Sequence, residues 1–231
     1  MQADVIVVAA GKGERMGTIL PKPFLPLLEI PLVIHTLRNI LKSSLVRKIF
    51  VVISAERDLL CREILEKYGP FPLPIRLVHG GAERQDSVRL GLEALDDESE
   101  VVAIHDAARL FITPHIFDAS IQTAAEYGGA IVALPARDTV KRVTKDRRIS
   151  ETVPRHDLWL SQTPQTFQTP LIREAHTRAF REGFVATDDA SLVEWMGKDV
   201  WIVPGIPQNF KVTTPEDLLL AEALLHIGSH I

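Results

Sequence analysis

The sequence predicts an α/β protein of Rossmann-like type, with a mostly parallel sheet flanked by helices in three layers and an inserted β-hairpin arm. Short runs of apolar, largely β-branched residues alternate with segments of helical periodicity, which is typical of buried parallel strands joined by crossover helices. The first such run is Val5–Val8. With 231 residues, 46% of them hydrophobic, we expect a single domain over residues 1–231.

Each predicted element has its own local signal. Pro31 suits the first turn of a helix, and the proline-rich run 69–74 ends the helix predicted over 56–68. Thr214 suits the N-cap of the last helix. The predicted strands cover 5–8, 49–53, 75–78, 101–104, 130–134 and 200–203. The predicted helices cover 31–43, 56–68, the residues after Glu83, 114–127, 170–182, 189–196 and the residues from Thr214 onward. No element type is predicted for the segment 158–167.

The alternation of strands and helices changes near Asp138. β-Branched residues recur in 139–143 and 149–153, on both sides of the turn 144–148, and this pattern predicts a β-hairpin. A hairpin of two strands is marginally stable alone. We therefore expect a protruding arm at about 137–157 that docks on a second subunit.

The composition argues against several classes of protein. No apolar run reaches the roughly 18 to 20 residues of a membrane helix, and the N-terminus lacks the features of a secretory signal. Cys61 is the single cysteine, which excludes an intramolecular disulfide and a cysteine-built metal site. A formal charge of −4 argues against a general nucleic-acid surface. We expect a cytoplasmic protein that binds neither nucleic acid nor membrane.

The first predicted strand runs into a long, glycine-rich and basic loop. Small residues let a ligand approach the main chain, where free N–H groups can cradle an anion such as a triphosphate. Counted from Gly11, Met16 stands where both the dinucleotide fingerprint and the P-loop require glycine. An ordinary strand-to-helix connection is the alternative interpretation. The small residues are Ala9, Ala10, Gly11 and Gly13, and the basic ones are Arg15 and Lys22.

Two further stretches follow predicted strands. Gly80-Gly81 precedes Arg84 and Ser87 at a helix start, which suits recognition of a base edge and a phosphate or ribose, although a plain turn also explains it. Asp106 follows the strand 101–104, where a carboxylate can hold Mg²⁺ against phosphate oxygens or merely cap a turn. Because parallel sheets bind ligands at the carboxyl ends of their strands, we expect the three loops to form one site.

Together, these stretches resemble the 2-C-methyl-D-erythritol 4-phosphate cytidylyltransferases of the non-mevalonate isoprenoid pathway. No single segment is specific, whereas the ordered set is, and it runs from residue 3 to about residue 225. The matching segments are 9–16, 21–22, 80–88, 105–109, 138–141, 152–155, 162–167, 187–189 and 209–213.

The resemblance implies transfer of a cytidylyl group from CTP to 2-C-methyl-D-erythritol 4-phosphate, with release of pyrophosphate. The acceptor phosphate would attack the α-phosphorus in line, with Mg²⁺ present and Arg15 and Lys22 stabilising the transition state as catalytic residues. It implies CTP contacts from Ala9, Ala10, Gly11, Gly13, Lys22, Gly81, Ala82, Arg84, Ser87 and Lys211. It implies acceptor contacts from Asp106, Ala107, Arg109, Thr139, Arg155, Thr163, Thr187 and Lys211, with Asp106 also holding the metal ion.

In this family the hairpin arm crosses to a partner subunit, so the resemblance also implies a homodimer in which some acceptor contacts come from the other chain. Two positions depart from the family pattern. Pro23 stands where glutamine is usual, and Leu110 where proline is expected. Neither position carries a charge, so we expect altered loop rigidity rather than lost activity.

Three alternative functions remain open at this point. A cytidylyltransferase for a pentitol phosphate such as ribitol 5-phosphate would share the CTP loops and differ in the acceptor pocket. A sugar-1-phosphate nucleotidyltransferase would use UTP or another triphosphate. A non-catalytic nucleotide-binding protein could keep the fold, although the intact residues Arg15, Lys22 and Asp106 argue against it.

Overall fold

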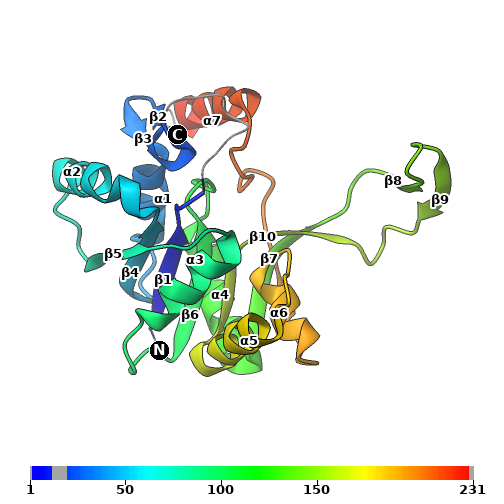
Figure 1. Cartoon of the computed structure of the whole chain (residues 1–231). Coiled ribbons are helices and arrows are strands. Elements are labelled where there is room, and N and C mark those ends of the chain that lie inside the picture. The colour runs from blue at the N-terminus through cyan, green and yellow to red at the C-terminus, as the bar shows by residue number, and fades with distance from the viewer. Residues whose placement is uncertain (1, 12–19, 229–231) are drawn as a thin grey trace.

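A computed structural model describes residues 2–11 and 20–228, and in this part of the chain helices flank a seven-stranded sheet (Figure 1). The strand order is β11-β7-β10-β6-β1-β4-β5. All neighbouring strands described in this sheet pair in parallel except β10, which is antiparallel to both of its neighbours. The strands are β1 (Ala3–Val8), β4 (Val46–Ile53), β5 (Ile75–His79), β6 (Val101–Asp106), β7 (Gly129–Pro135), β10 (Trp159–Gln168) and β11 (Trp201–Pro204).

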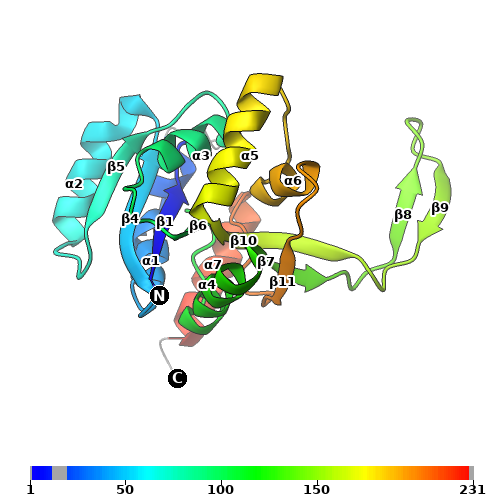
Figure 2. The ribbon, with the colours of Figure 1, turned by 90° about the horizontal axis from the view of Figure 1, so that it is seen from below.

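Helices cover both faces of the sheet, which confirms the predicted three layers (Figure 2). The first face packs against α1 (Leu32–Ile40), α2 (Asp58–Tyr68) and α4 (Pro114–Tyr127). The second face packs against α3 (Arg84–Glu93), α5 (Thr169–Glu182) and α6 (Asp189–Trp195). None of the helices in the described residues is long and apolar enough to cross a membrane.

The strand β1 illustrates why its sequence is a continuous apolar run rather than an alternating one. Val5 and Val7 face the cluster formed with α1 and α4, while Ile6 faces the cluster formed with α3 and α5. All three side chains have 0% exposure. Because both faces are covered, each successive side chain of this strand is buried in an apolar layer.

A third, smaller cluster lies beneath the last helix, α7 (Pro215–Gly228). It includes Leu110, which is completely buried, together with Leu27 and Val212. Leu110 therefore serves as a core residue beneath α7. Ahead of this cluster the chain forms short elements, namely η2 (Lys22–Phe24), β2 (Pro26–Leu27) and β3 (Ile30–Pro31); a further short element, η3 (Ala55–Arg57), precedes α2.

The strand β10 has no counterpart in the sequence-based prediction. It is inserted between β6 and β7, and its pairing with β7 shifts register between Ser161 and Gln165. Proline lacks the amide donor that a ladder needs, so Pro164 is tolerated in this central strand because it lies within the irregularity. The irregular segment carries polar side chains at the carboxyl end of β6, where a binding site was predicted.

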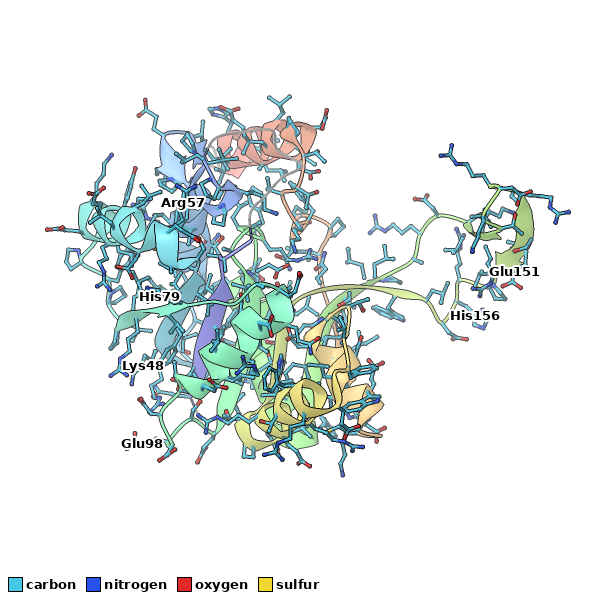
Figure 3. The ribbon with its side chains drawn as sticks, viewed as in Figure 1. Lys48, Arg57, His79, Glu98, Glu151 and His156 are labelled. Atoms are coloured by element: carbon cyan, nitrogen blue, oxygen red, sulfur yellow. The ribbon has the colours of Figure 1, made fainter. Side chains whose placement is uncertain are left out.

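The predicted hairpin is confirmed by β8 (Val140–Val143) and β9 (Ile149–Val153), which pair antiparallel. It projects far from the rest of the chain, and Glu151 and His156 lie on this arm, away from the body (Figure 3). Apolar side chains of the arm are exposed, with Val143 at 55% and Ile149 at 60%.

Candidate functional site

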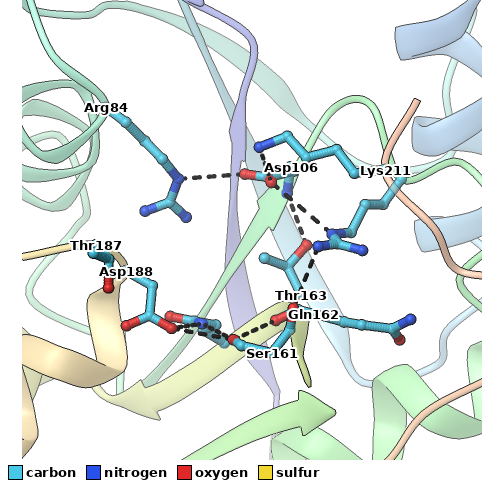
Figure 4. A pocket seen from close by; sticks show the side chains of 10 residues that line it. Arg84, Asp106, Ser161, Gln162, Thr163, Thr187, Asp188 and Lys211 are labelled. Atoms are coloured by element: carbon cyan, nitrogen blue, oxygen red, sulfur yellow. Dashed lines mark hydrogen bonds and ion pairs between the residues drawn. The ribbon is translucent and has the colours of Figure 1, made fainter. Parts of the chain in front are cut away.

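A pocket of about 270 Å³ opens at the carboxyl end of β6, between the start of α3, the irregular part of β10 and the loops before α6 and α7 (Figure 4). Among the described residues that line it are three cations and two carboxylates, so its lining carries a net positive charge. Such a pocket suits an anionic ligand. The lining residues are Arg84, Asp106, Arg109, Ser161, Gln162, Thr163, Gln165, Thr187, Asp188 and Lys211.

The carboxylate of Asp106 lies at the centre of this charge cluster. Lys211 Nζ is 2.7 Å from its Oδ2, and Arg84 Nε is 3.4 Å from its Oδ1. Arg109 Nε is farther, 4.0 Å from Oδ2. Burial alone would raise the pKa of Asp106, but the charges of Arg84 and Lys211 hold it well below its ordinary value. Asp106 is therefore ionised at neutral pH and holds three cations at one point.

A series of hydrogen bonds through Thr163 and His105 holds the main chain of Asp106 and Arg109. The Asp106 N–H donates to Thr163 Oγ1 (3.1 Å), and His105 Nε2 lies 2.9 Å from the carbonyl oxygen of Arg109. A carbonyl can only accept, so Nε2 carries the proton. Burial lowers the pKa of His105 to about 4, so the ring is neutral and Nδ1 accepts from the Thr163 hydroxyl at 3.0 Å. His105 is thus a structural residue.

Arg109 is held by main-chain carbonyls as well as by charge. Its Nη1 donates to the carbonyl oxygen of Asn209 at 2.8 Å. Asn209 is completely buried, and its side-chain amide donates to the carbonyl oxygen of Thr163 at 2.9 Å and to Gln162 Oε1 at 3.2 Å. These contacts join β10 to the loop before α7, so hydrogen bonds fix the side of the pocket around Arg109.

The glycine pair before α3 is required by close approach. A Cβ at Gly80 would lie 2.6 Å from Ser87 Oγ and 3.0 Å from Ala10 Cβ. The Gly81 N–H donates to Ser87 Oγ at 3.2 Å, and Ser87 is buried. Ser87 therefore supports the turn from inside, and the turn lies directly against the end of β1.

The structure brings part of the predicted site together in one place. Arg84, Asp106, Arg109, Thr163, Thr187 and Lys211 all line the pocket. Ala9, Ala10 and Gly11 directly follow β1, whose end lies beside β6, since the Ala107 N–H donates to the carbonyl oxygen of Val8 at 3.1 Å.

Other predicted site residues lie elsewhere. Ala107 is almost completely buried in the core on the first face of the sheet, and its carbonyl accepts from Thr36 Oγ1 at 2.7 Å. Ala82 is exposed beside Gly81, and Lys22 begins η2.

Thr139 and Arg155 are exposed, flank the hairpin strands and do not line the pocket of their own chain. Gly13 and Arg15 fall outside the described residues.

Four lining residues were not predicted as site residues: Ser161, Gln162, Gln165 and Asp188. Gln165 Oε1 accepts from the N–H of Asp189 at 2.9 Å, and Asp188 Oδ1 accepts from the N–H of Ser191 at 3.0 Å. Gln165 and Asp188 therefore accept hydrogen bonds at the start of α6, and Gln165 joins this helix to β10. The polar run in an otherwise apolar segment was the available signal, since central strands rarely carry such residues without a function.

The described residues contain no group of three or more His, Cys, Asp or Glu side chains that could hold a metal ion. Asp106 supplies one carboxylate with 9% of its side chain exposed. Mg²⁺ is commonly bound by one or two carboxylates together with substrate phosphates. The donor set therefore fits an ion that arrives with a phosphate ligand.

Comparison with known proteins gives consistent results. The family model described as 2-C-methyl-D-erythritol 4-phosphate cytidylyltransferase matches residues 3–227. The protein of that name from Bacillus cereus is 44% identical over 96% of this chain and 97% of its own, and the one from Geobacter metallireducens is 46% identical over 97% and 98%.

Solved structures agree with these sequence relatives. The 4-diphosphocytidyl-2C-methyl-D-erythritol synthase of Anaerococcus prevotii superposes with a TM-score of 0.86 at 32% identity, over 97% of this chain and 96% of that one. The 2-C-methyl-D-erythritol 4-phosphate cytidylyltransferase of Thermus thermophilus gives a TM-score of 0.80 at 35% identity, over 97% and 98%.

The charge cluster predicts a pH-dependent contribution of Asp106 to stability. A carboxyl with a depressed folded pKa contributes stability that is complete above its unfolded pKa, about 3.9, and is lost as pH falls toward the folded value. Asp106→Asn should lower the free energy of unfolding by about 3 kcal/mol at pH 7 and pH 5, because it removes the carboxylate that Arg84, Arg109 and Lys211 share. Below about pH 4 the difference from wild type should shrink.

Urea unfolding at pH 7, 5 and 3 measures this effect. Asp138→Asn, the same change at an exposed arm position, should alter stability by less than about 0.5 kcal/mol throughout. A loss in Asp106→Asn that stays constant from pH 7 to pH 3 would contradict the charge-cluster interpretation.

Proposed function

The chain belongs to the 2-C-methyl-D-erythritol 4-phosphate cytidylyltransferase family, and we propose that the pocket around Asp106 is where its two phosphate substrates meet. As a member of that family, it is a nucleotidyltransferase that transfers the cytidylyl group of CTP to 2-C-methyl-D-erythritol 4-phosphate in isoprenoid precursor synthesis. The observation that supports the placement is the convergence of Arg84, Arg109 and Lys211 on Asp106.

The reaction explains why a site of this kind needs fixed positive charge. A phosphate oxygen of the acceptor forms a bond to the α-phosphorus of CTP. The bond from that phosphorus to the bridging oxygen of the β-phosphate breaks, and pyrophosphate leaves with the electron pair. Both reactants are anions, so catalysis depends on charge neutralisation and in-line alignment. A phosphate monoester has a second pKa of about 6 and is a competent nucleophile at neutral pH without a catalytic base.

We assign roles by position around the pocket. Arg84 and Lys211 lie on opposite oxygens of the Asp106 carboxylate, so both can turn remaining N–H groups toward the triphosphate. Gly81, with Ala82 beside it, presents main chain for the cytidine, supported by Ser87. Ala9, Ala10 and Gly11, which follow β1, are proposed to line the triphosphate side, and the same role is proposed for Gly13. Lys22 and Arg15 are proposed to stabilise the charge that develops on the α-phosphate and on pyrophosphate.

The acceptor phosphate is proposed to lie on the opposite side of the pocket. Arg109, Thr163, Thr187 and Lys211 all line the pocket. We assign the first three to the acceptor and let Lys211 contact both substrates. Arg109 is anchored by its bond to Asn209, so its charge is preorganised rather than mobile. Ala107 is proposed to contribute main chain between Asp106, at the end of β6, and Arg109, which follows it.

Mg²⁺ is proposed to be held by Asp106 and by the phosphates of CTP. When bound, the ion neutralises triphosphate charge and helps to orient the pyrophosphate leaving group. The residues of this chain then position the two substrates. Asp106, which also pairs with Arg84 and Lys211, would hold the ion.

A homodimer is proposed in which each arm reaches the acceptor pocket of the other subunit. Thr139 and Arg155 are exposed and lie away from the pocket of their own chain. Arg155 donates to the carbonyl oxygen of Arg137, which fixes it at the base of the arm. Exposed Val143 and Ile149 offer the apolar surface that an isolated hairpin needs to bury for stability.

Release of pyrophosphate from CTP and Mg²⁺ tests the function, with 2-C-methyl-D-erythritol 4-phosphate and ribitol 5-phosphate supplied in separate reactions. Family membership disfavours the pentitol phosphate, so we expect turnover with the methylerythritol substrate alone. Turnover with only ribitol 5-phosphate would contradict the acceptor assignment. Release with UTP in place of CTP at an equal rate would contradict the assignment of the nucleotide.

The proposed transition-state role of Lys22 predicts a separation of kinetic effects. Lys22→Ala should lower kcat by about 100-fold or more, because the lost charge acts chiefly on the transition state. The Kd for CTP, measured by calorimetry, should rise by less than about fivefold. Lys198→Ala, which removes an exposed lysine outside the pocket, should change neither quantity. Comparable losses in kcat and in CTP affinity would remove Lys22 from this role.

The proposed arm contact predicts an effect on the KM for the acceptor without an effect on the affinity for CTP. Arg155→Glu should raise the KM for 2-C-methyl-D-erythritol 4-phosphate by about tenfold or more, because a like charge faces the acceptor phosphate. The affinity for CTP should stay within about twofold of wild type. Arg148→Glu makes the same charge change at the exposed turn of the arm and should leave both unchanged. An acceptor KM that does not move in Arg155→Glu would exclude this residue from the site.

A further inference from the structure

Arg84 contacts a second carboxylate besides that of Asp106. Its Nη2 lies 2.8 Å from Asp189 Oδ2, while its Nε lies 3.4 Å from Asp106 Oδ1. Asp106 lines the pocket, whereas Asp189 does not and has a side chain only 1% exposed. One guanidinium thus bridges a carboxylate that lines the pocket and a buried carboxylate that does not.

Asp189 is itself held from two sides. His176 Nε2 lies 3.2 Å from its Oδ1, and the His176 side chain is also only 1% exposed. A carboxylate oxygen only accepts, so His176 Nε2 carries a proton toward it. The Asp189 N–H donates to Gln165 Oε1 at 2.9 Å, which fixes the backbone at the start of α6. The carboxylate is therefore fixed by α5 through its side chain and by β10 through its main chain.

A buried carboxylate is costly unless a cation compensates it. Burial would raise the pKa of Asp189, but the charge of Arg84 and the hydrogen bond from His176 lower it, so the group remains ionised. An apolar side chain would fill the same space without that cost. A buried carboxylate at position 189 is explained if its charge serves to hold Arg84 in place.

Arg84 needs such an anchor because its contact with Asp106 is weak. At 3.4 Å the Arg84–Asp106 contact is long, and Lys211 competes for the same carboxylate at 2.7 Å. An arginine side chain carries about 2 kcal/mol of rotamer entropy, which one long contact does not restrain. The shorter ion pair to Asp189, 2.8 Å between Nη2 and Oδ2, gives the guanidinium a second point of attachment. Neither ion pair uses Nη1, so its N–H groups can face a substrate oxygen.

We propose that Asp189, oriented by His176, is a positioning residue for Arg84 and sets the direction in which this arginine meets the triphosphate of CTP. The proposal rests on the function given above, in which Arg84 contacts CTP. Asp189 and His176 touch no substrate; they act through the guanidinium. The arrangement joins α3, α5 and α6 into one support behind the nucleotide side of the pocket.

A double-mutant cycle on Arg84 and Asp189 tests the proposal. Asp189→Asn should lower kcat/KM for CTP, and the affinity for CTP measured by calorimetry without acceptor, by about tenfold in the wild-type background. In the Arg84→Gln background the same substitution should change both by less than about twofold, because the group it positions is gone. Glu194→Gln, at an exposed carboxyl of the same helix α6, should have no effect in either background.

His176 supplies a second test that does not require a buried charge to be left unpaired. His176→Gln keeps an N–H donor near the position of Nε2 and should retain CTP affinity within about twofold, whereas His176→Leu removes the donor and should lose about fivefold or more. Equal losses in these two variants, or equal losses from Asp189→Asn in both Arg84 backgrounds, would make the group merely structural and overturn the proposal.

The outcomes separate this proposal from the proposed function. If wild type binds CTP and releases pyrophosphate with 2-C-methyl-D-erythritol 4-phosphate while the cycle is additive, the function stands and the positioning role is wrong. If wild type binds CTP without turnover and the cycle is non-additive, the positioning role stands and the acceptor assignment is wrong. Failure of wild type to bind CTP would overturn both.

Discussion

The site depends on one electrostatic constraint, which is the burial of the ionised Asp106 carboxylate at the end of β6. A carboxylate with 9% of its side chain exposed must be compensated, and its partners come from three separate parts of the chain. Arg84 begins α3, Arg109 follows β6, and Lys211 precedes α7. Satisfying one buried charge therefore brings these segments together at a single pocket whose lining carries a net positive charge.

The surrounding fold keeps this charge cluster in place. The polar, irregular part of β10 supplies hydrogen bonds where apolar strands could not, as when Thr163 accepts from the main chain of Asp106. Gly80 lets α3 approach the end of β1, so that Arg84 reaches across to β6. Preorganised charge of this kind stabilises a transition state without reorganising during the reaction. The architecture is consistent with a phosphoryl-transfer enzyme that aligns two anions.

Local patterns predicted most elements but few of the partners. The strands β1, β4 and β6, the helices and the hairpin each follow from periodicity or from turn residues, and Asp106 follows from its place after an apolar run. The position of β10 could not be predicted, because Pro164 and its polar neighbours resemble a loop and only the register shift against β7 accommodates them. The pairing of Arg84 with Asp189 likewise cannot be predicted from local patterns, since it joins two helices that lie far apart in the sequence.

A crystal structure of the protein with CTP and Mg²⁺ tests the central claim most directly. We expect triphosphate oxygens within hydrogen-bond distance of Arg84 and Lys211, a magnesium ion on the Asp106 carboxylate, and the α-phosphorus facing Arg109 and Thr163. A triphosphate bound away from this cluster, with the contacts of Asp106 unchanged, would contradict the view that the buried carboxylate organises the substrate site.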